Sequence, residues 1–472
     1  MSQLNPIKTR FCPSPTGHIH LGNVRAALFS ALFAKHKEGK FLLRIEDTDK
    51  SRSSDEFTQL LMQELRWLGL DWQEGPEVGG DHAPYWQSQR QPLYDQFYLQ
   101  LQEKNLCYAC FCTEQQLTLQ RKLQRAAGKP PRYAGTCRSL TVEQVQAKEA
   151  QGLTSTLRFA VPKGQLIQFE DLVHGQQCFN SDDLGDFVIR RADGTAPFLF
   201  SNSIDDALME VTHVLRGVDH LANTPRQMLI LQALQLPLSA YGHFGLILGA
   251  DGAPLSKRNG SRSVKELREE GYIAEAVINY MARLGHTYNN NHYMTFVELA
   301  KDFSVDSLSR SPSRFDLSQL LFWQKAAVAH HSDDFLWEWM GKDVQAQVPA
   351  AYQQRFITTV KPNVVFPTDA LHWATILFAD EFVFNEKQQE ILTQAGAEFF
   401  QETLLAVTEH GLDSAKIISV IQEKLQLKGK ALFMPLRVAL TGEGHGPELA
   451  GLLDLLGLER VKRRLQAASQ IL

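Results

Sequence analysis

The first fifty residues constrain the fold of this chain more than any other segment. The turn-forming stretch 13–17 (PSPTG) precedes an amphipathic run from Val24 to His36, and an apolar run, 41–43, follows Gly39. This order predicts a strand, a tight loop, a helix and a second strand. Alternation of apolar strands with helical runs continues to about residue 105, which is typical of a parallel α/β sheet.

The start of the predicted helix has the residues of a phosphate site. It carries His18, His20, Gly22 and Asn23. A helix N-terminus exposes unpaired N–H groups and a positive dipole end, and histidine there donates hydrogen bonds to phosphate oxygens. Gly22 leaves room for a nucleotide against the backbone. Neither a Walker loop nor GxGxxG is present, and a bare HxG is more often an ordinary loop, so the flanking residues carry this interpretation.

A second loop, residues 249–260 (GADGAPLSKRNG), places cations after a turn signal. Mobile Lys or Arg side chains clamp the negative charge that develops on phosphates during adenylyl transfer. A short basic loop taken alone is more often only solvated. The candidate nucleotide-binding residues of this loop are Leu255, Ser256, Lys257 and Arg258.

Composition limits the class of protein. The chain has 472 residues, is 44% hydrophobic and carries a net charge of −5, so nucleic-acid binding requires local basic patches. One such patch is Arg121, Lys122, Arg125, Lys129, Arg132 and Arg138. A solvated helix face is the commoner meaning of such a run. No membrane-length apolar run, no signal-peptide core and only six cysteines predict a cytoplasmic protein without a disulfide framework.

The chain changes character along its length. Cysteines and basic residues crowd residues 106–195, which read as an insertion between two halves of the sheet. The part beyond about 325 is mostly helical, with amphipathic runs near 385–410, 415–428 and 446–469. Ser54 to Gly69 is also predicted as a helix, because apolar residues recur at helical spacing and Gly69 ends them.

The stretch from Arg10 to Asp49 resembles the N-terminal signature of class I glutamyl-tRNA synthetases, RFxPSPTGxLHIGxxRxAL followed by a helix and FxLRIEDTD. His20–Asn23 stands at the "HIGH" motif of that family, with Asn23 in place of the second histidine. Residues 193–227 are similar to its second signature, xDGxPTYxxxNxxDDxxMGxTHVxR followed by GEDHLxNTPxQ. Phe198 stands where many members have tyrosine, which removes one hydroxyl from the site.

The resemblance extends to the basic loop at 249–260 and to the C-terminal third of the chain. The basic loop is similar to the "KMSKS" loop, which usually reads K-L-S-K-R-H-G in glutamyl enzymes. Lys257 is retained, whereas Pro254 replaces the first lysine and Asn259 the histidine. The C-terminal third resembles the helical anticodon-binding part of bacterial glutamyl enzymes, most clearly at 433–442 (FMPLRVALTG).

The resemblance implies a fold and a domain organisation. The fold class is α/β: a Rossmann-like class I synthetase catalytic domain with an α+β insertion, followed by an all-α C-terminal anticodon-binding region. The implied parts are a catalytic domain (1–105 and 196–250), an acceptor-stem-binding insertion with a possible zinc site (106–195), a stem-contact region with the KMSKS-like loop (251–325) and a helical anticodon-binding domain (326–472).

The resemblance implies a glutamate pocket, built from residues whose chemistry suits such a ligand. An arginine fork holds a carboxylate bidentately, and a carboxylate receives an ammonium group. Arg216 in a surface ion pair and Glu46 in a helix cap are the plainer alternatives. Carried over by position, Arg10 and Arg216 contact the glutamate carboxylates. The resemblance completes the pocket with Ser14, Glu46, Phe198 and Asn202.

The cysteines suggest a metal. Cys110 and Cys112 form a Cys-x-Cys pair, and Cys137 follows Tyr133, which fits part of a four-ligand zinc site. The spacing is similar to a zinc motif of some glutamyl-tRNA synthetases, C-x-C-x20-Y-x3-C-x-H, whose last histidine is Ser139 here. The implied ligands are Cys110, Cys112, Tyr133 and Cys137. Cys107 is another candidate, and a site that has lost its metal is the alternative.

The resemblance implies an ATP-dependent glutamate–tRNA ligase, acting as a cytoplasmic monomer with Mg²⁺. His20 and Lys257 are the predicted catalytic residues, and the predicted ATP site is His18, His20, Gly22, Asn23, Leu255, Ser256, Lys257 and Arg258. The acceptor is tRNA-Glu, tRNA-Gln or both. Direct glutaminyl synthesis is disfavoured because the last third reads helical. Two alternatives are more distant. The RIEDTD segment argues against a small-molecule nucleotidyltransferase, and the retained Lys257 argues against a catalytically inactive RNA-binding paralogue.

Overall fold

The first fifty residues form the predicted strand–loop–helix–strand unit. The structure is a computed structural model that describes residues 6–49, 53–255, 262–379 and 383–471. Strand β1 (Lys8–Phe11) lies parallel to β2 (Lys40–Leu43), with Arg10 opposite Leu42. Helix α1 (Leu21–His36) connects them and begins three residues before the predicted Val24.

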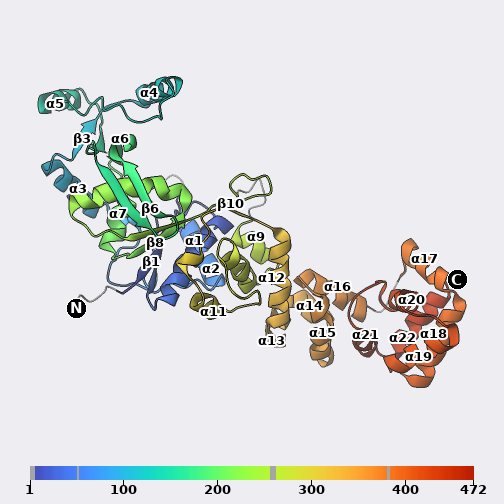
Figure 1. Cartoon of the computed structure of the whole chain (residues 1–472). Helices are drawn as coiled ribbons and strands as arrows, with labels where there is room; N and C mark the ends of the chain where they lie inside the picture. Colours follow the sequence, from blue (N-terminus) through green and yellow to red (C-terminus); the bar gives the residue numbers. More distant parts are fainter. Residues whose placement is uncertain (1–5, 50–52, 256–261, 380–382, 472) are drawn as a thin grey trace. The chain divides into compact units, whose positions relative to one another are not determined.

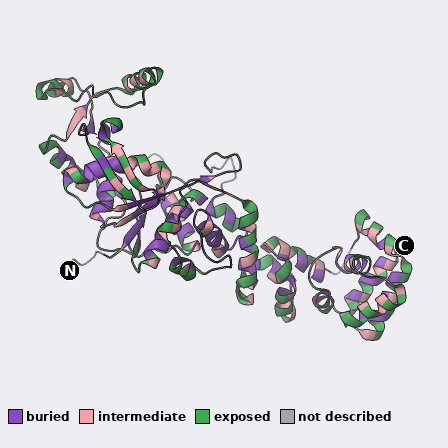
Figure 2. Ribbon diagram, viewed as in Figure 1, coloured by how far each residue is buried: buried purple, intermediate pink, exposed green. Residues whose placement is uncertain are grey.

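Helix α1 is buried on nearly all sides, so the prediction that the run from Val24 to His36 is amphipathic was wrong. It contacts β1, β2 and β8 (His213–Gly217), and also α11 (Phe296–Lys301). A helix covered both by a sheet and by another helix has no solvated face to keep polar. The helix that carries the candidate phosphate site is therefore fixed in the core of the fold (Figure 2).

The central strands run parallel and end at the same edge. A four-stranded sheet has the order β6-β5-β9-β8, in which β9 (Ala240–Phe244) is parallel to β8 and to β5 (Leu166–Asp171), while β6 (Gly175–Asn180) is antiparallel to β5. β1 lies beside β8, where the Thr212 N–H donates to the Lys8 carbonyl at 2.9 Å. Open α/β sheets bind ligands outside the carboxyl ends of their strands. The Rossmann-like fold class is confirmed.

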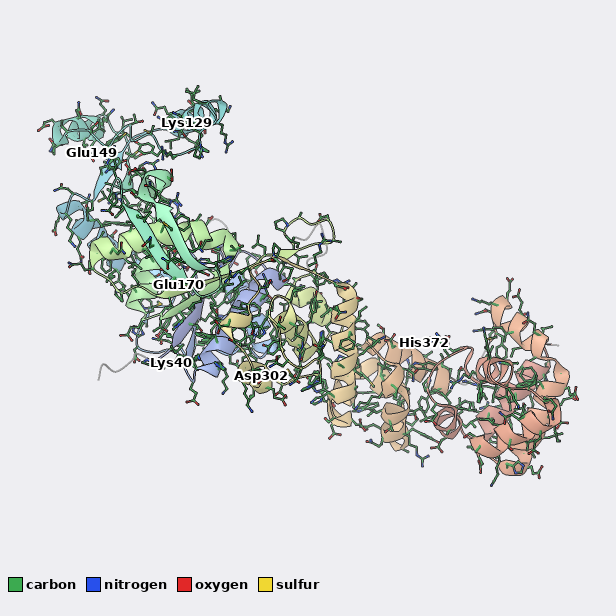
Figure 3. The ribbon with its side chains drawn as sticks, viewed as in Figure 1. Lys40, Lys129, Glu149, Glu170, Asp302 and His372 are labelled. Atoms are coloured by element: carbon green, nitrogen blue, oxygen red, sulfur yellow. The ribbon has the colours of Figure 1, made fainter. Side chains whose placement is uncertain are left out.

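The inserted segment has a different architecture. Strands β3 (Cys107–Cys110), β4 (Thr156–Phe159) and β7 (Phe187–Arg190) form an antiparallel sheet in that order. Helices α4 (Glu114–Ala126) and α5 (Val142–Ala150) have no buried residue. Lys129, just after α4, and Glu149, in α5, lie on this exposed part (Figure 3).

The remaining elements of this part pack around the sheets. Helix α2 (Asp55–Trp67) confirms the predicted helix after Ser54, whose hydroxyl accepts from the Phe57 N–H at 3.1 Å. The other elements are α3 (Gln91–Glu103), α6 (Ser181–Leu184), α7 (Phe198–Leu208), α8 (Thr224–Leu234), β10 (Ile247–Leu248), α9 (Val264–Glu269), α10 (Ala274–Arg283) and β11 (Ser313–Arg314).

The chain divides into two compact units. The first consists of residues 1–268 and 277–317, and the second of residues 269–276 and 318–472 (Figure 1). The boundaries predicted at 105, 195, 250 and 325 stay predictions. No helix in the described ranges has both the length and the apolar character needed to cross a bilayer.

The second unit is helical, as predicted, but two expected runs are each two helices. Gly396 (φ +82°) separates α17 from α18, and Gly457 (φ +74°) separates α21 from α22, because a left-handed φ ends a helix. The helices of this unit are α12 (Leu317–His330), α13 (Asp333–Met340), α14 (Lys342–Gln347), α15 (Gln353–Val360), α16 (Pro367–Phe378), α17 (Glu386–Ala395), α18 (Ala397–His410), α19 (Ser414–Leu425), α20 (Lys430–Thr441), α21 (Leu449–Leu456) and α22 (Leu458–Ser469).

Candidate active site

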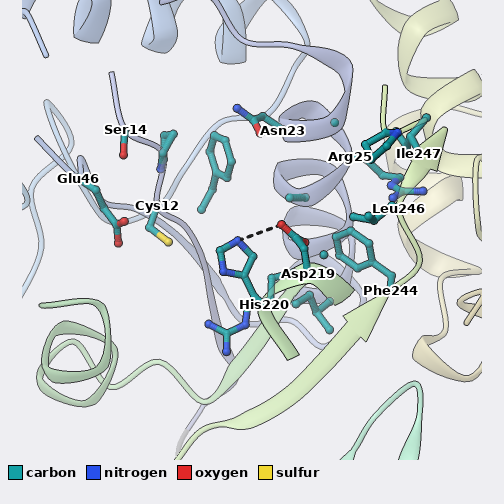
Figure 4. A pocket seen from close by; sticks show the side chains of 18 of the residues that line it. Cys12, Ser14, Asn23, Arg25, Glu46, Asp219, His220, Phe244, Leu246 and Ile247 are labelled. Carbon is teal, nitrogen blue, oxygen red and sulfur yellow. Dashed lines mark ion pairs between the residues drawn. The ribbon is translucent and has the colours of Figure 1, made fainter. Parts of the chain in front are cut away.

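A cavity of about 520 Å³ opens where β1, β2 and β8 end. Figure 4 shows Ser14 and Glu46 on one side of it and Arg25 and Ile247 on the other. Five of the six predicted glutamate-binding residues line this cavity: Arg10, Ser14, Glu46, Phe198 and Arg216. Their convergence from four separate segments agrees with a common binding site, and their individual roles stay predictions.

Glu46, directly after β2, is held by one oxygen. Its Oε1 accepts from Asn202 Nδ2 at 2.7 Å and from Arg44 Nη2 at 3.3 Å. All hydrogen bonds that the described residues donate to this carboxylate end on Oε1, which leaves Oε2 for a cationic ligand group in the cavity. Burial raises the pKa of Glu46 above its ordinary value, although Arg44 and Asn202 act in the opposite direction.

Asn202 is the one predicted glutamate-binding residue that does not line the cavity. It is fully buried on α7, behind Glu46, and is not among the residues that line the cavity. Its Nδ2 donates to Glu46 and its Oδ1 accepts from Gln227 Nε2 at 3.0 Å. The geometry therefore makes Asn202 a support for Glu46.

Arg10 belongs to a buried cluster of charges. Its Nε donates to both carboxylate oxygens of Asp206, at 3.2 and 3.3 Å, and Arg44 Nη1 donates to the same carboxylate at 2.8 Å. Burial alone would raise the pKa of Asp206, but the two guanidinium groups outweigh it and lower that pKa. Asp206 is thus a fixed anion that orients Arg10 at the cavity wall.

Arg216, on β8, is held on two sides and open on the third. Its Nη2 donates to Thr224 Oγ1 at 2.8 Å and to Gln227 Oε1 at 2.7 Å, and its Nε donates to His243 Nε2 at 3.0 Å. Its Nη1 is buried and has no hydrogen-bond partner among the described residues. An unpaired guanidinium N–H is costly, so this atom favours an anionic acceptor in the cavity.

The predicted nucleotide residues divide into three groups. Gly22, Asn23 and Leu255 line the cavity, whereas His18 and His20 do not. His18 Nδ1 lies 2.8 Å from Glu64 Oε1, so a side chain of α2 anchors the loop. His20 is the N-cap residue of α1. Ser256, Lys257 and Arg258 lie outside the described residues.

Sequence reasoning missed several residues of the cavity. Arg25 is buried on α1, donates to the carbonyls of Gly245 and Leu284, and lies 5.0 Å from the centre of the Phe244 ring. Its place in the N-terminal signature was the available signal. The other missed lining residues are Phe11, Cys12, Pro13, Thr16, Ala26, Leu215, Gly217, Asp219, His220, Phe244, Leu246 and Ile247, while Pro254 of the KMSKS-like loop also lines the cavity. Asp219 and His220, which directly follow the Arg216 strand, pair at 3.7 Å.

The three predicted cysteine ligands lie together in the insertion. The sulfurs of Cys110, Cys112 and Cys137 are all within 4.8 Å of one another. Tyr133 Oη lies 3.3 Å from Cys110 Sγ and 3.6 Å from Cys112 Sγ. Cys107 is not in this group. The structure therefore brings together the four residues implied by the family spacing, with Tyr133 beside the sulfurs.

Known proteins match nearly the whole chain. Residues 6–322 match the family described as tRNA synthetases class I (E and Q), catalytic domain, and residues 327–469 match an anticodon binding domain. The fold therefore is that of a class I aminoacyl-tRNA synthetase.

Individual relatives narrow this class. Glutamate–tRNA ligase 1 of Coxiella burnetii is 54% identical over 98% of this chain and 100% of that protein. Glutamate–tRNA ligase 2 of Nitrosococcus oceani is 54% identical over 98% of each. A crystal structure of a glutamate tRNA ligase from Elizabethkingia meningosepticum, in complex with its amino acid, has a TM-score of 0.88, 29% identity and 99% coverage of both chains. The chain belongs to the glutamate–tRNA ligase family.

The buried His243 predicts a pH dependence of stability. Burial lowers the pKa of His243 to about 4, and the Arg216 charge acts the same way, although Asp171 opposes them. An unfolded histidine titrates near pH 6.5. The stabilising contribution is therefore complete above about pH 6.5 and is lost as the pH falls towards 4, by about 3 kcal/mol in the free energy of unfolding.

A matched variant isolates this contribution. Thermal unfolding of wild type and His243→Gln is measured between pH 7 and pH 4.5. We expect the midpoint of the wild type to fall more steeply, because glutamine does not titrate and the other histidines are common to both proteins. Parallel profiles would contradict the assignment.

Proposed function

We propose that this protein ligates L-glutamate to the 3′ end of tRNA, using ATP. The observation that carries the proposal is the charge pattern of the cavity, which Arg10, Arg216 and Glu46 all line. Two guanidinium groups and one carboxylate complement the two carboxylates and one ammonium of glutamate. The names of the relatives and the amino-acid complex of the Elizabethkingia enzyme support the same substrate.

The proposed reaction has two steps and needs no protein nucleophile. The glutamate α-carboxylate attacks the α-phosphate of ATP, which gives glutamyl-adenylate and pyrophosphate. A hydroxyl of the tRNA 3′-terminal adenosine then attacks the activated carbonyl, and AMP leaves. Catalysis would rest on orientation and on stabilisation of phosphate charge, in which His20 and Lys257 are the proposed participants.

Magnesium would enter with the nucleotide. Among the described residues, no cluster of three or more carboxylate or histidine ligands exists; the one group of metal-ligating residues is that of the three cysteines. A magnesium ion typically keeps several waters and is held largely by substrate phosphates. Mg²⁺ is therefore proposed as part of the ATP substrate.

Basic residues of the insertion are the proposed contact for tRNA, but fewer are available than the sequence suggested. Arg121 pairs with Glu114, and Arg138 donates to Asp186 at 2.9 Å. The remaining exposed cations near α4 include Lys122 and Lys129. Phosphate contacts of this kind give affinity without sequence preference. The cytoplasmic location and the monomeric state stay proposals.

Charging assays test the proposed function. Purified tRNA-Glu and tRNA-Gln are incubated separately with labelled glutamate, ATP and the protein. We expect ATP-dependent attachment of glutamate to at least one of them, and comparing the two decides the acceptor. Folded protein that charges neither tRNA would contradict the proposal and favour an inactive RNA-binding paralogue.

Gly22 tests the position of ATP. A Cβ added at Gly22 meets no protein atom within 4 Å, so Gly22→Ala has room in the empty protein. The methyl group would enter the cavity where the nucleotide is proposed to lie. We expect the KM for ATP to rise roughly tenfold, a loss of about 1.4 kcal/mol of binding, while the unfolding midpoint is unchanged. Gly444→Ala, whose Cβ makes only ordinary contact with Met434, is the control. A wild-type KM in Gly22→Ala would place ATP elsewhere.

We also propose that Cys110, Cys112, Cys137 and Tyr133 hold a structural zinc ion. Tetrahedral zinc with Zn–S bonds of about 2.3 Å has sulfur–sulfur edges of about 3.8 Å. The Cys112–Cys137 Sγ distance is 3.7 Å, close to that edge. The donor set fits zinc, since three sulfurs and one oxygen converge there.

Metal analysis checks the zinc proposal. We expect about one zinc per chain after purification without chelators. Cys137→Ser should lose the metal, and Tyr133→Phe should release it faster to a chromogenic chelator. Cys178→Ser, an exposed cysteine outside the cluster, is the matched control. Metal-free wild type with all four side chains intact would mean that the site has lost its metal.

A further inference from the structure

We propose that Asp171 and His243 are positioning residues for glutamate, which act through Arg216. The proposal rests on the function proposed above and goes beyond it, because neither residue lines the cavity. The three side chains form a buried hydrogen-bonded series, with exposed fractions of 1% for Asp171, 0% for His243 and 6% for Arg216. Of the three side chains, only that of Arg216 lines the cavity, so it is the one through which the other two would act on glutamate.

The chain begins at the end of β5. Asp171 Oδ1 accepts from the Val173 and His174 N–H groups at 2.9 and 2.8 Å, which fixes the carboxylate. Its Oδ2 lies 2.5 Å from His243 Nδ1, on the neighbouring strand β9. The backbone turn after β5 therefore determines the direction in which Asp171 points.

The carboxylate selects the tautomer of His243. An ionised Asp171 is only an acceptor, so His243 must carry its proton on Nδ1. The other ring nitrogen, Nε2, is then an acceptor and receives the Nε–H of Arg216 at 3.0 Å. With the proton on Nε2 instead, two N–H groups would face each other. Asp171 thus makes His243 a partner for arginine.

The guanidinium of Arg216 is consequently fixed in its own plane. His243 holds its Nε, while Thr224 and Gln227 hold its Nη2. Nη1 is the donor left without a partner among the described residues. A pre-oriented donor binds a carboxylate without losing side-chain freedom on binding. The Asp171–His243 pair therefore presents Nη1 to the substrate.

Asp171→Asn tests the tautomer argument with a nearly isosteric change. The amide places an N–H towards His243 Nδ1, which moves the imidazole proton to Nε2 and opposes it to Arg216. We expect the KM for glutamate in tRNA charging to rise roughly tenfold. The KM for ATP and kcat at saturating glutamate should change by less than about twofold, because no hydrogen bond among the described residues joins Gly22, Asn23 or Leu255 to Asp171, His243 or Arg216.

Two amides at position 243 provide a matched pair. Glutamine in His243→Gln places an oxygen near the position of Nε2 and can accept from Arg216, whereas the shorter asparagine in His243→Asn reaches only towards Asp171. We expect the KM for glutamate to be at least about fivefold higher in His243→Asn than in His243→Gln. Both variants are polar and carry the same chemical group, so a general effect of losing the imidazole is common to both.

The outcomes separate this proposal from the proposed function. Equal KM values for glutamate in wild type, Asp171→Asn and His243→Asn would overturn the positioning proposal. A rise in the KM for ATP and a fall in kcat that match the rise in the KM for glutamate would overturn it too. If Asp171→Asn does not fold, the order of the two His243 variants decides. A wild-type protein that charges no tRNA with glutamate overturns the proposed function instead.

Discussion

The buried charges around Asp206 are the constraint on which the site depends. Arg10 and Arg44 both donate to Asp206, and Arg44 also reaches Glu46, all inside the protein. Buried ions cost several kcal/mol each unless they are paired, and removing one member leaves its partner uncompensated. The cluster therefore ties β1, β2 and α7 to one arrangement. The two charges that face the cavity, Arg10 and Glu46, are oriented by the same network.

A second network holds Arg216 and is connected to the first. Asp171, His243 and Arg216 form one line, and Gln227 connects Arg216 with Asn202, which donates to Glu46. Each of these bonds satisfies a polar group that would otherwise be buried without a partner. Arg216 and Glu46 are thus joined by the amide side chains of Gln227 and Asn202, which can both donate and accept. The bridge holds the two charged groups through the fold's own hydrogen bonds.

Charged residues that line the cavity could be predicted from the sequence, whereas the buried residues that hold them in place could not. Arg10, Glu46 and Arg216 could be identified because arginine forks and a carboxylate stand in a recognisable signature. His243 and Asp171 could not, since a lone histidine in an apolar strand is most often a core residue, and their pairing depends on neighbouring strands far apart in sequence. The burial of α1 was missed for a similar reason: α11, which covers it, lies some 260 residues later. Tyr133 came only from the family spacing; its contact with the sulfurs is a tertiary feature.

The two proposed substrate sites offer different kinds of surface. On the proposed glutamate side, the charged side chains of Arg216 and Glu46 are each held by buried partners. The nucleotide side includes Gly22, the second residue of a buried helix, where the backbone itself faces the cavity. In the proposed site, glutamine would offer the guanidinium donors one neutral oxygen and an N–H₂ where glutamate offers two charged oxygens, and an unpaired buried donor costs about 1–3 kcal/mol. Selection of the amino acid would then depend on the supports of Arg10 and Arg216, because a guanidinium that cannot turn away keeps its donors aimed at that group.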